Sequence, residues 1–580
     1  MIRVTALILP LLLTLLFIGC GSETTKTNYK YNDNTVRVAI LSEPRTLNAL
    51  VSPTRAARIV FDQLYFELLD FDPETLEMTP QLTKSNPIVT ETTEGKFKGG
   101  NAYQYEIIEE ATWDDGTPIT GEDVLFSLKM VFSQAAHPGY ASYYEYVKDF
   151  QVDTDNPKKF TVFTDAKYML NEAAISNTFV VRESLIDPDG VLKKYSIGQL
   201  NSPEIKKIAQ SEELQQFIEN FRSTKFSNTP EGVNNCGPYR LDVWESGQFI
   251  RLVKKKNWWG DKVASTSKLF ANEPDTIIYK VIPDQNATIN ALKEGEVDVA
   301  FSIDSEAFVD FKDNAEAAKN YNLSNPSTST IYFVAFNMKN PKLSDVRIRR
   351  AIAQLMDVDG YLANFYNGFG ERITLPIPNA APYHNSALPP IKFDIEEAKS
   401  LITEAGWIDT DNDGFVDKNG TNLSLEILIP TSKASENIAT LLQTNMKKAG
   451  IEVTVKSVRG AATLSRKKEY EIYLGARGLD ATTLVDLKQE YHTESDVPGG
   501  FNITGFGNEK TDAMIDELRV TLDETKRTNL YKEIQSEIYN AQPAIYLFSP
   551  YERLAVHKRF EMEASLKRPS FHLNDLDLIE

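Results

Sequence analysis

The sequence predicts an α/β or mixed α+β protein, because short apolar strands and amphipathic helices alternate along most of its 580 residues. Apolar residues make up 42% of the chain and charged residues 25%, a balance typical of globular proteins. No internal repeat and no low-complexity segment interrupts the alternation. The length is sufficient for roughly three to four domain-sized cores.

Period-two alternation predicts the strands of the first half, and apolar residues at helical spacing predict its helices. The strand that follows the N-terminal region ends at the turn residues Ser42, Glu43 and Pro44. The expected elements, in order, are a strand over 36–41, a helix over 56–69, a strand over 104–108, a helix capped by Thr120, a helix over 202–221 and a hairpin around Glu245-Ser246-Gly247.

The second half continues the same alternation. Gly295, Gly406 and Gly450 follow helical patterns at the positions where a glycine commonly ends a helix. The expected elements are strands over 277–282, 297–301, 330–338, 423–430, 451–458 and 471–478, a helix ending at Gly295, a helix capped by Ser344, helices over 394–404 and 437–448, and a strongly helical segment over 511–540.

The charge balance excludes nucleic acid as a partner. The chain has 82 acidic and 62 basic residues, a net charge of −20, and no basic stripe of useful length. Binding to a phosphate backbone requires a clustered positive surface.

The first twenty residues indicate export. Arg3 precedes an apolar run over 6–18, which is too short for a comfortable transmembrane anchor, and Cys20 follows Gly19. The ending LLFIGC resembles a bacterial lipoprotein signal, which implies a lipidated Cys20; the alternative is an ordinary signal peptide with an incidental cysteine. We expect residues 1–20 to be the signal ending at that cysteine, 21–35 a flexible tether, and the protein a membrane-anchored lipoprotein of the cell envelope, facing the periplasm or exterior.

The chain has two cysteines, Cys20 and Cys236. With Cys20 used for lipid attachment, no intramolecular disulfide can form, so stability must come from core burial. Cys236 lies among turn residues, and we expect it to be a buried small side chain.

The sequence motifs of common catalytic sites are absent. The chain has no G-x-S-x-G elbow, no G-x-x-x-x-G-K-[ST] loop and no H-E-x-x-H helix, and its five histidines are widely spaced. A secreted hydrolase would therefore need a catalytic constellation that the sequence does not display, and we expect no enzymatic activity.

The segment 409–420, DTDNDGFVDKNG, has the spacing of a calcium loop, because Asp409, Asp411, Asp413 and Asp417 occupy positions 1, 3, 5 and 9. An EF-hand, however, needs a glutamate at position 12, where Gly420 stands, and helices on both sides. Asp, Asn and Gly also suit a tight hairpin. The sequence favours this hairpin, and we expect no resident cofactor. A structural Ca²⁺ and a calcium-dependent adhesion role are the alternatives.

Several long blocks, in order, resemble the solute-binding proteins of ABC importers that include oligopeptide and dipeptide receptors (solute-binding family 5). They cover most of the chain from residue 36 to about 554. They include VRVAILSEPRTLNAL, WDDGTPITGEDVLFSL, IPDQNATINALKEGEVDVA, FNMKNPKLSDVRIRRAIAQLMD and NEKTDAMIDELR.

The resemblance implies a two-lobed periplasmic-binding-protein fold of type II, with two crossover strands and an extra inserted subdomain. Lobe one would comprise residues 36–305 and 549–580, with the subdomain at about 85–230, and lobe two residues 306–548. Ligand enclosed between the lobes would favour the closed state, which a membrane permease then recognises. We expect a monomer that captures peptides; a sugar, opine or metal chelate is the alternative ligand.

The resemblance also implies candidate ligand-binding residues. In YLGARGLDATTL, Asp480 occupies the position that accepts a peptide's α-ammonium in the family. Arg477 stands where the family has tryptophan; with Gly478 it belongs to the predicted site, where it would meet a ligand carboxylate or pair with Asp480. Ser42, Glu43 and Pro44 match a segment that lines the cleft of relatives, although a plain strand-ending turn explains them equally well.

Overall fold

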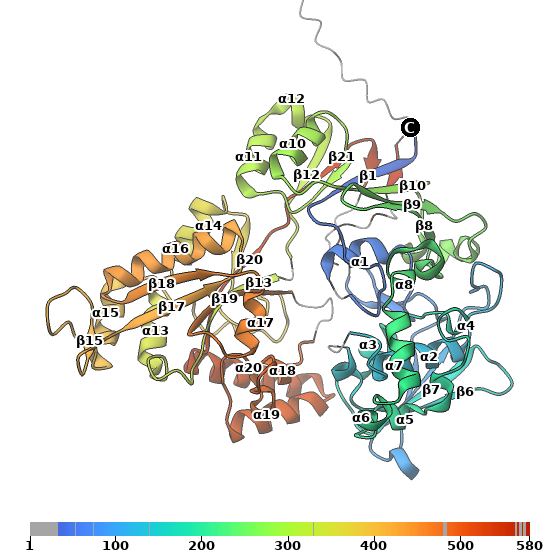
Figure 1. Cartoon of the computed structure of the whole chain (residues 1–580), viewed down its shortest axis with the longest axis horizontal. Helices are drawn as coiled ribbons and strands as arrows, with labels where there is room; N and C mark the ends of the chain where they lie inside the picture. Colours follow the sequence, from blue (N-terminus) through green and yellow to red (C-terminus); the bar gives the residue numbers. More distant parts are fainter. Residues whose placement is uncertain are drawn as a thin grey trace, which may run out of the picture. The chain divides into compact units, whose positions relative to one another are not determined.

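The structure, a computed structural model, describes residues 33–580 except 53, 74, 138–139, 329, 479–483, 563–564, 566, 568–570, 572, 574–575 and 580. Cys20 and the predicted signal therefore lie outside the described residues. The segment Asn34–Glu580 forms one compact unit. Among the described residues, no helix has both the length and the apolar character needed to cross a membrane. The strands of this unit build two large sheets, one for each lobe (Figure 1).

Lobe one is built on a seven-stranded mixed sheet. Its central strand β1 has every residue buried, because it pairs in parallel with β10 on one side and β11 on the other. A hairpin, β8–β9, extends one edge in antiparallel register. In spatial order the strands are β12 (Tyr321–Ser324), β21 (Leu554–His557), β11 (Val299–Ala300), β1 (Thr35–Ile40), β10 (Thr276–Val281), β9 (Phe249–Lys254) and β8 (Tyr239–Glu245).

A subdomain with its own four-stranded antiparallel sheet is inserted in lobe one. Thr120 caps helix α2, and the Asp123 carboxylate accepts the Thr120 backbone N–H at 3.0 Å, as the sequence predicts. The sheet order is β4 (Ile88–Glu91), β5 (Asn101–Glu106), β7 (Lys159–Thr164) and β6 (Val147–Val152). The helices of the subdomain are α2 (Gly121–Phe132), α3 (Asn171–Ser176), α4 (Glu183–Ile186), α5 (Ile197–Leu200), α6 (Ile205–Ile208), α7 (Glu212–Phe221), α8 (Lys225–Asn228) and α9 (Pro230–Val233).

Smaller elements complete lobe one. Helices α10 to α12 share a hydrophobic cluster with residues of β1 and β21. The bounds are α1 (Arg55–Phe61), β2 (Leu69–Phe71), β3 (Met78–Pro80), α10 (Gln285–Lys293), α11 (Ser305–Asp313), α12 (Ala315–Ala318), β22 (Phe560–Glu561) and β23 (Asp577–Leu578).

Lobe two is built on a six-stranded sheet in the order β14 (Gly370–Arg372), β20 (Ala544–Pro550), β13 (Thr330–Phe336), β19 (Ile472–Gly478), β17 (Ser424–Ile429) and β18 (Glu452–Ser457). Helix α16 packs along β17 and β18 (Figure 1). The helices are α13 (Val346–Gln354), α14 (Val358–Phe365), α15 (Ile395–Glu404), α16 (Lys433–Lys448), α17 (Ala461–Arg466), α18 (Lys488–Tyr491), α19 (Glu509–Val520) and α20 (Glu524–Ala541).

Two short segments carry the chain between the sheets, one after β12 and one between β20 and β21. The second sheet thus begins at Thr330, whereas the expected boundary was near residue 306; the intervening α11, α12 and β12 belong to lobe one through their packing. The two crossovers bond to each other. Glu552 N–H donates to the Pro326 carbonyl at 2.8 Å, and Thr328 Oγ1 donates to the Pro550 carbonyl at 2.6 Å. They therefore form one paired hinge.

Several helix predictions differ from the structure. The expected helix over 202–221 is two helices, α6 and α7, because Ser211 caps the start of α7. The expected helix over 56–69 ends at Phe61, because the apolar residues that follow pack into two different clusters of lobe one. Asp345, not Ser344, caps α13, with its carboxylate accepting the Arg347 N–H at 2.9 Å. The segment over 511–540 is two helices, α19 and α20, because Asp523 caps the N-terminus of α20 and so begins a new helix.

A buried ion cluster fastens the C-terminal segment to the sheet of lobe one. Asp298 is fully buried, and its carboxylate accepts Arg559 Nε at 2.8 Å and Nη2 at 3.0 Å. The backbone N–H of Arg37 on β1 donates to the same carboxylate at 2.9 Å. One acid therefore ties together two distant parts of the chain. Cys236 is buried as expected, and burial raises the pKa of its thiol to about 12.

Candidate ligand-binding site

The end of strand β19 carries the predicted site of lobe two. β19 lies between β13 and β17, so its backbone is held on both sides. Arg477 pairs with Ile331 of β13, and Gly478, the last residue of the strand, pairs with Thr330. Asp480 lies outside the described residues, so its role stays a prediction.

Arg477 is held by partners inside lobe two. Its guanidinium forms an ion pair with Glu490 of α18 and donates to the Pro376 carbonyl. The side chain is 15% exposed. Because Glu490 already compensates its charge, Arg477 does not require a ligand carboxylate as a partner. Sequence reasoning missed Glu490, because it lies thirteen positions after Arg477 and no local pattern connects the two residues.

Three buried tyrosines, Tyr383, Tyr491 and Tyr546, interact electrostatically with Arg477. The hydroxyls of Tyr491 and Tyr546 lie 2.7 Å apart, and burial raises the pKa of Tyr546 to about 12. The ring of Tyr383 stacks on Tyr531 with centroids 4.0 Å apart. At neutral pH these buried phenols are uncharged, so they offer hydrogen bonds and apolar faces without adding charge.

The segment Ser42-Glu43-Pro44 follows β1, as predicted, and Glu43 contacts the β8–β9 hairpin. Its carboxylate accepts Trp244 Nε1 at 3.0 Å, Ser246 Oγ at 2.9 Å and the Gly247 N–H at 2.5 Å. Through these contacts Glu43 attaches the end of β1 to the β8–β9 hairpin. Ser42 is exposed and Pro44 buried, and a ligand-binding role for the three residues stays a prediction.

The aspartate loop forms the hairpin that the sequence favours. Strands β15 (Asp417–Lys418) and β16 (Thr421–Asn422) pair antiparallel. The Asp417 carboxylate is buried and accepts the Thr410 N–H at 2.8 Å and its hydroxyl at 2.7 Å, which lowers the pKa of Asp417. Asp417 therefore stabilises the hairpin through its bonds to Thr410. It is not one of the three aspartates whose carboxylates lie close enough to share a cation.

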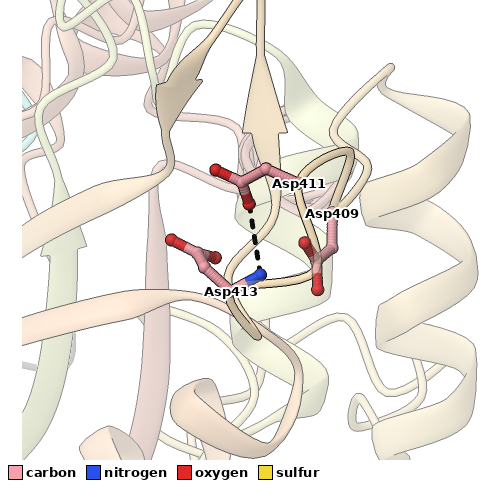
Figure 2. A group of neighbouring side chains, drawn as sticks. All are labelled: Asp409, Asp411 and Asp413. Atoms are coloured by element: carbon pink, nitrogen blue, oxygen red, sulfur yellow. Dashed lines mark hydrogen bonds between the residues drawn. The ribbon is translucent and has the colours of Figure 1, made fainter.

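The other three aspartates gather at the tip of the loop (Figure 2). One carboxylate oxygen from each of Asp409, Asp411 and Asp413 lies within 4.8 Å of the others. The same carboxylates accept backbone N–H groups of the loop: Asp409 from Gly414 at 3.1 Å and Asp411 from Asp413 at 3.2 Å. Two of the three are exposed. The loop is thus capped by its own main chain, as Asx turns are.

Two α/β lobes joined by a paired hinge define a class of protein that closes around a small molecule. A comparison with known protein families identifies the same class. The model for bacterial extracellular solute-binding proteins, family 5 middle region, matches residues 77–487. The chain belongs to this family of solute-binding proteins.

The similarity to known proteins extends over nearly the whole chain. The oligopeptide-binding protein AppA of Bacillus subtilis (strain 168) is 26% identical over 532 residues, covering 90% of this chain and 88% of its own. The structure of that AppA in complex with a nonapeptide has a TM-score of 0.72 at 22% identity and covers 94% and 99% of the two chains. NikA from Brucella suis in complex with Fe(III)-EDTA has a TM-score of 0.73 at 19% identity, with 94% and 100% covered.

Proposed function

We propose that this chain is the receptor of an ABC importer and captures peptides between its lobes for delivery to a membrane permease. The observation that carries the proposal is the likeness to an oligopeptide-binding protein along 90% of the chain. Contacts made to ligand by both lobes exist only after closure, so ligand shifts the hinge equilibrium towards the closed form. The protein makes and breaks no bond of its ligand.

The alternative ligand is a metal chelate or another non-peptide solute. It is favoured by the fold shared with NikA holding Fe(III)-EDTA and by Arg477, a cation at a position where the family's peptide receptors have tryptophan. Pairing of Arg477 with Glu490 argues for the peptide, because a neutralised arginine adds little attraction for an anionic chelate.

The proposed setting is the cell envelope. Lipidation of Cys20 would attach the chain to a membrane, and the predicted tether, which would end before Thr35 because that residue belongs to β1, would let the folded body reach a permease. We propose that the receptor acts as a monomer. These proposals rest on the sequence of the first 35 residues and on the family.

A thermal-unfolding screen tests the ligand class. Peptides of two to six residues, sugars and nickel or iron chelates are added separately to the purified protein. Binding to the folded state stabilises it by RT ln(1 + [L]/Kd), about 2.7 kcal/mol at a hundredfold excess over Kd. We expect peptides to raise the unfolding temperature. A shift with a chelate or sugar and none with any peptide would replace the peptide by that solute.

For the aspartate loop we propose a self-capped hairpin with no resident cation. Calorimetric titration of metal-stripped protein with Ca²⁺ is expected to show no tight uptake, because the carboxylates already accept main-chain donors. Tight uptake that disappears in Asp411→Ala would reverse this assignment and identify a structural calcium site.

A further inference from the structure

A buried arginine of lobe two contacts the inserted subdomain of lobe one. Arg519, near the end of α19, donates from Nε to the Asp486 carboxylate at 2.9 Å. The exposed fractions of the two side chains are 4% and 11%. Asp486 also accepts the Lys488 N–H at 2.9 Å. These three residues belong to lobe two, so the ion pair is complete without any help from lobe one.

Residues of the subdomain bind to this ion pair from the other side. The Tyr168 hydroxyl donates to Asp486 at 2.6 Å, and Arg519 Nη1 donates to the Tyr146 hydroxyl at 2.9 Å. Arg519 also reaches Glu145, with Nη2 to Oε2 at 3.1 Å. The guanidinium carbon lies 4.8 Å from the Tyr168 ring centroid and 5.5 Å from that of Tyr146, within cation–π range.

A backbone bond and apolar contacts accompany the side chains. The Met169 N–H donates to the Arg519 carbonyl at 2.8 Å. Tyr168, Met169 and Leu170 share a hydrophobic cluster with residues of lobe two that include Tyr383 and Tyr531. Gln489 of α18 donates to Ser142 of the subdomain at 2.7 Å. The lobes therefore meet through direct protein contacts in addition to the paired hinge.

We propose that Tyr146, Tyr168 and Met169 of the subdomain, with Asp486 and Arg519 of lobe two, form a clasp that favours lobe closure independently of ligand. The clasp is releasable because Arg519 keeps Asp486 as its partner on opening, and the Glu145 side chain that it leaves is 49% exposed to water. Opening removes the hydrogen bonds of Tyr146 and Tyr168 to this ion pair, the contact of Arg519 with Glu145, the cation–π contacts and apolar packing. An interlobe ion pair between two fully buried side chains would instead leave both charges buried and unpaired on opening.

The clasp sets ligand affinity through the population of the closed form. Apparent affinity falls in proportion to the fraction of molecules that can close competently. Loss of one clasp hydrogen bond therefore weakens binding even of a ligand that never touches Tyr168. This consequence rests on the proposed capture of ligand by closure, whereas the clasp itself is measurable without ligand.

Hydrogen exchange of the ligand-free, full-length chain tests the clasp. The Met169 amide is protected by the Arg519 carbonyl across the lobes, so its exchange reports opening. Tyr168→Phe keeps the ring but removes the hydroxyl bond to Asp486, and we expect exchange at Met169 to become about three- to tenfold faster. The Val180 amide, which donates to Phe66 inside lobe one, is expected to keep its rate.

Tyr105→Phe is the matched control, because Tyr105 is a buried tyrosine whose hydroxyl bonds Ser176 within the subdomain, at 3.0 Å. It should leave exchange at Met169 unchanged. Equal exchange in Tyr168→Phe and Tyr105→Phe, or faster exchange at Val180 together with Met169, would refute the clasp. Absence of peptide binding by the unaltered protein would refute the proposed function instead, and leaves the exchange result intact.

Discussion

Asp480→Ala is expected to weaken peptide binding by more than about tenfold, which corresponds to about 1.4 kcal/mol or more. The resemblance to peptide receptors implies that the residue at this position would accept the α-ammonium of the peptide. A carboxylate enclosed with an ammonium forms a charge-assisted hydrogen bond, and removing it leaves the ligand's charge desolvated without a partner. Titration calorimetry of the variant and the unaltered chain with one peptide measures the difference.

Two controls make this experiment specific. Asp411→Ala removes an aspartate of the same lobe in an exposed loop and should leave affinity unchanged. An N-acetylated peptide lacks the ammonium, so it should bind weakly and equally to the unaltered chain and to Asp480→Ala. Unchanged affinity for the free peptide in Asp480→Ala would place this residue outside the site and favour the non-peptide alternative.

Asp298→Ala is expected to destabilise the protein by about 3–5 kcal/mol, the cost of breaking a buried ion cluster by removing one partner. Asp298 is fully buried and serves both Arg559 and the backbone of Arg37. The substitution removes the acceptor that these buried donors share. Chemical denaturation at neutral pH measures the change in the free energy of unfolding.

Asp242→Ala is the matched comparison, because Asp242 pairs with Arg251 at 2.7 Å on the surface of the same lobe. The side chains are 29% and 41% exposed, and such pairs contribute less than about 1 kcal/mol. A similar decrease in the free energy of unfolding in the two variants would mean that burial does not set the strength of the Asp298 cluster.

Local patterns predicted most of the fold. The buried alternation of β1, the cap at Thr120 and the hairpin after Gly406 are properties of neighbouring residues, and the structure contains all three. The predicted two-lobed fold is confirmed by the structures that share it. The predictions that differed, such as the continuation of a helix beyond Phe61, depend on which core an apolar segment joins, and a periodicity does not contain that information.

The candidate site was predictable in part. Arg477 and Gly478 lie at the end of a central strand, as the sequence indicates, and Asp480 lies just beyond the described part of that segment. The partner of Arg477, Glu490, and the contacts of Glu43 with the β8–β9 hairpin come from tertiary packing. The clasp joins residues more than three hundred positions apart, a separation across which one sequence carries no signal.

Native mass spectrometry of the purified full-length chain, offered an equimolar mixture of short peptides, sugars and metal chelates, tests the central claim most directly. The proposal predicts a single 1:1 adduct whose added mass is that of a peptide, released intact and unhydrolysed on activation. An adduct with a chelate or sugar alone, with no peptide bound at any concentration in the screen, would contradict it. Hydrolysed peptide in the mixture would contradict the receptor role and identify an enzyme.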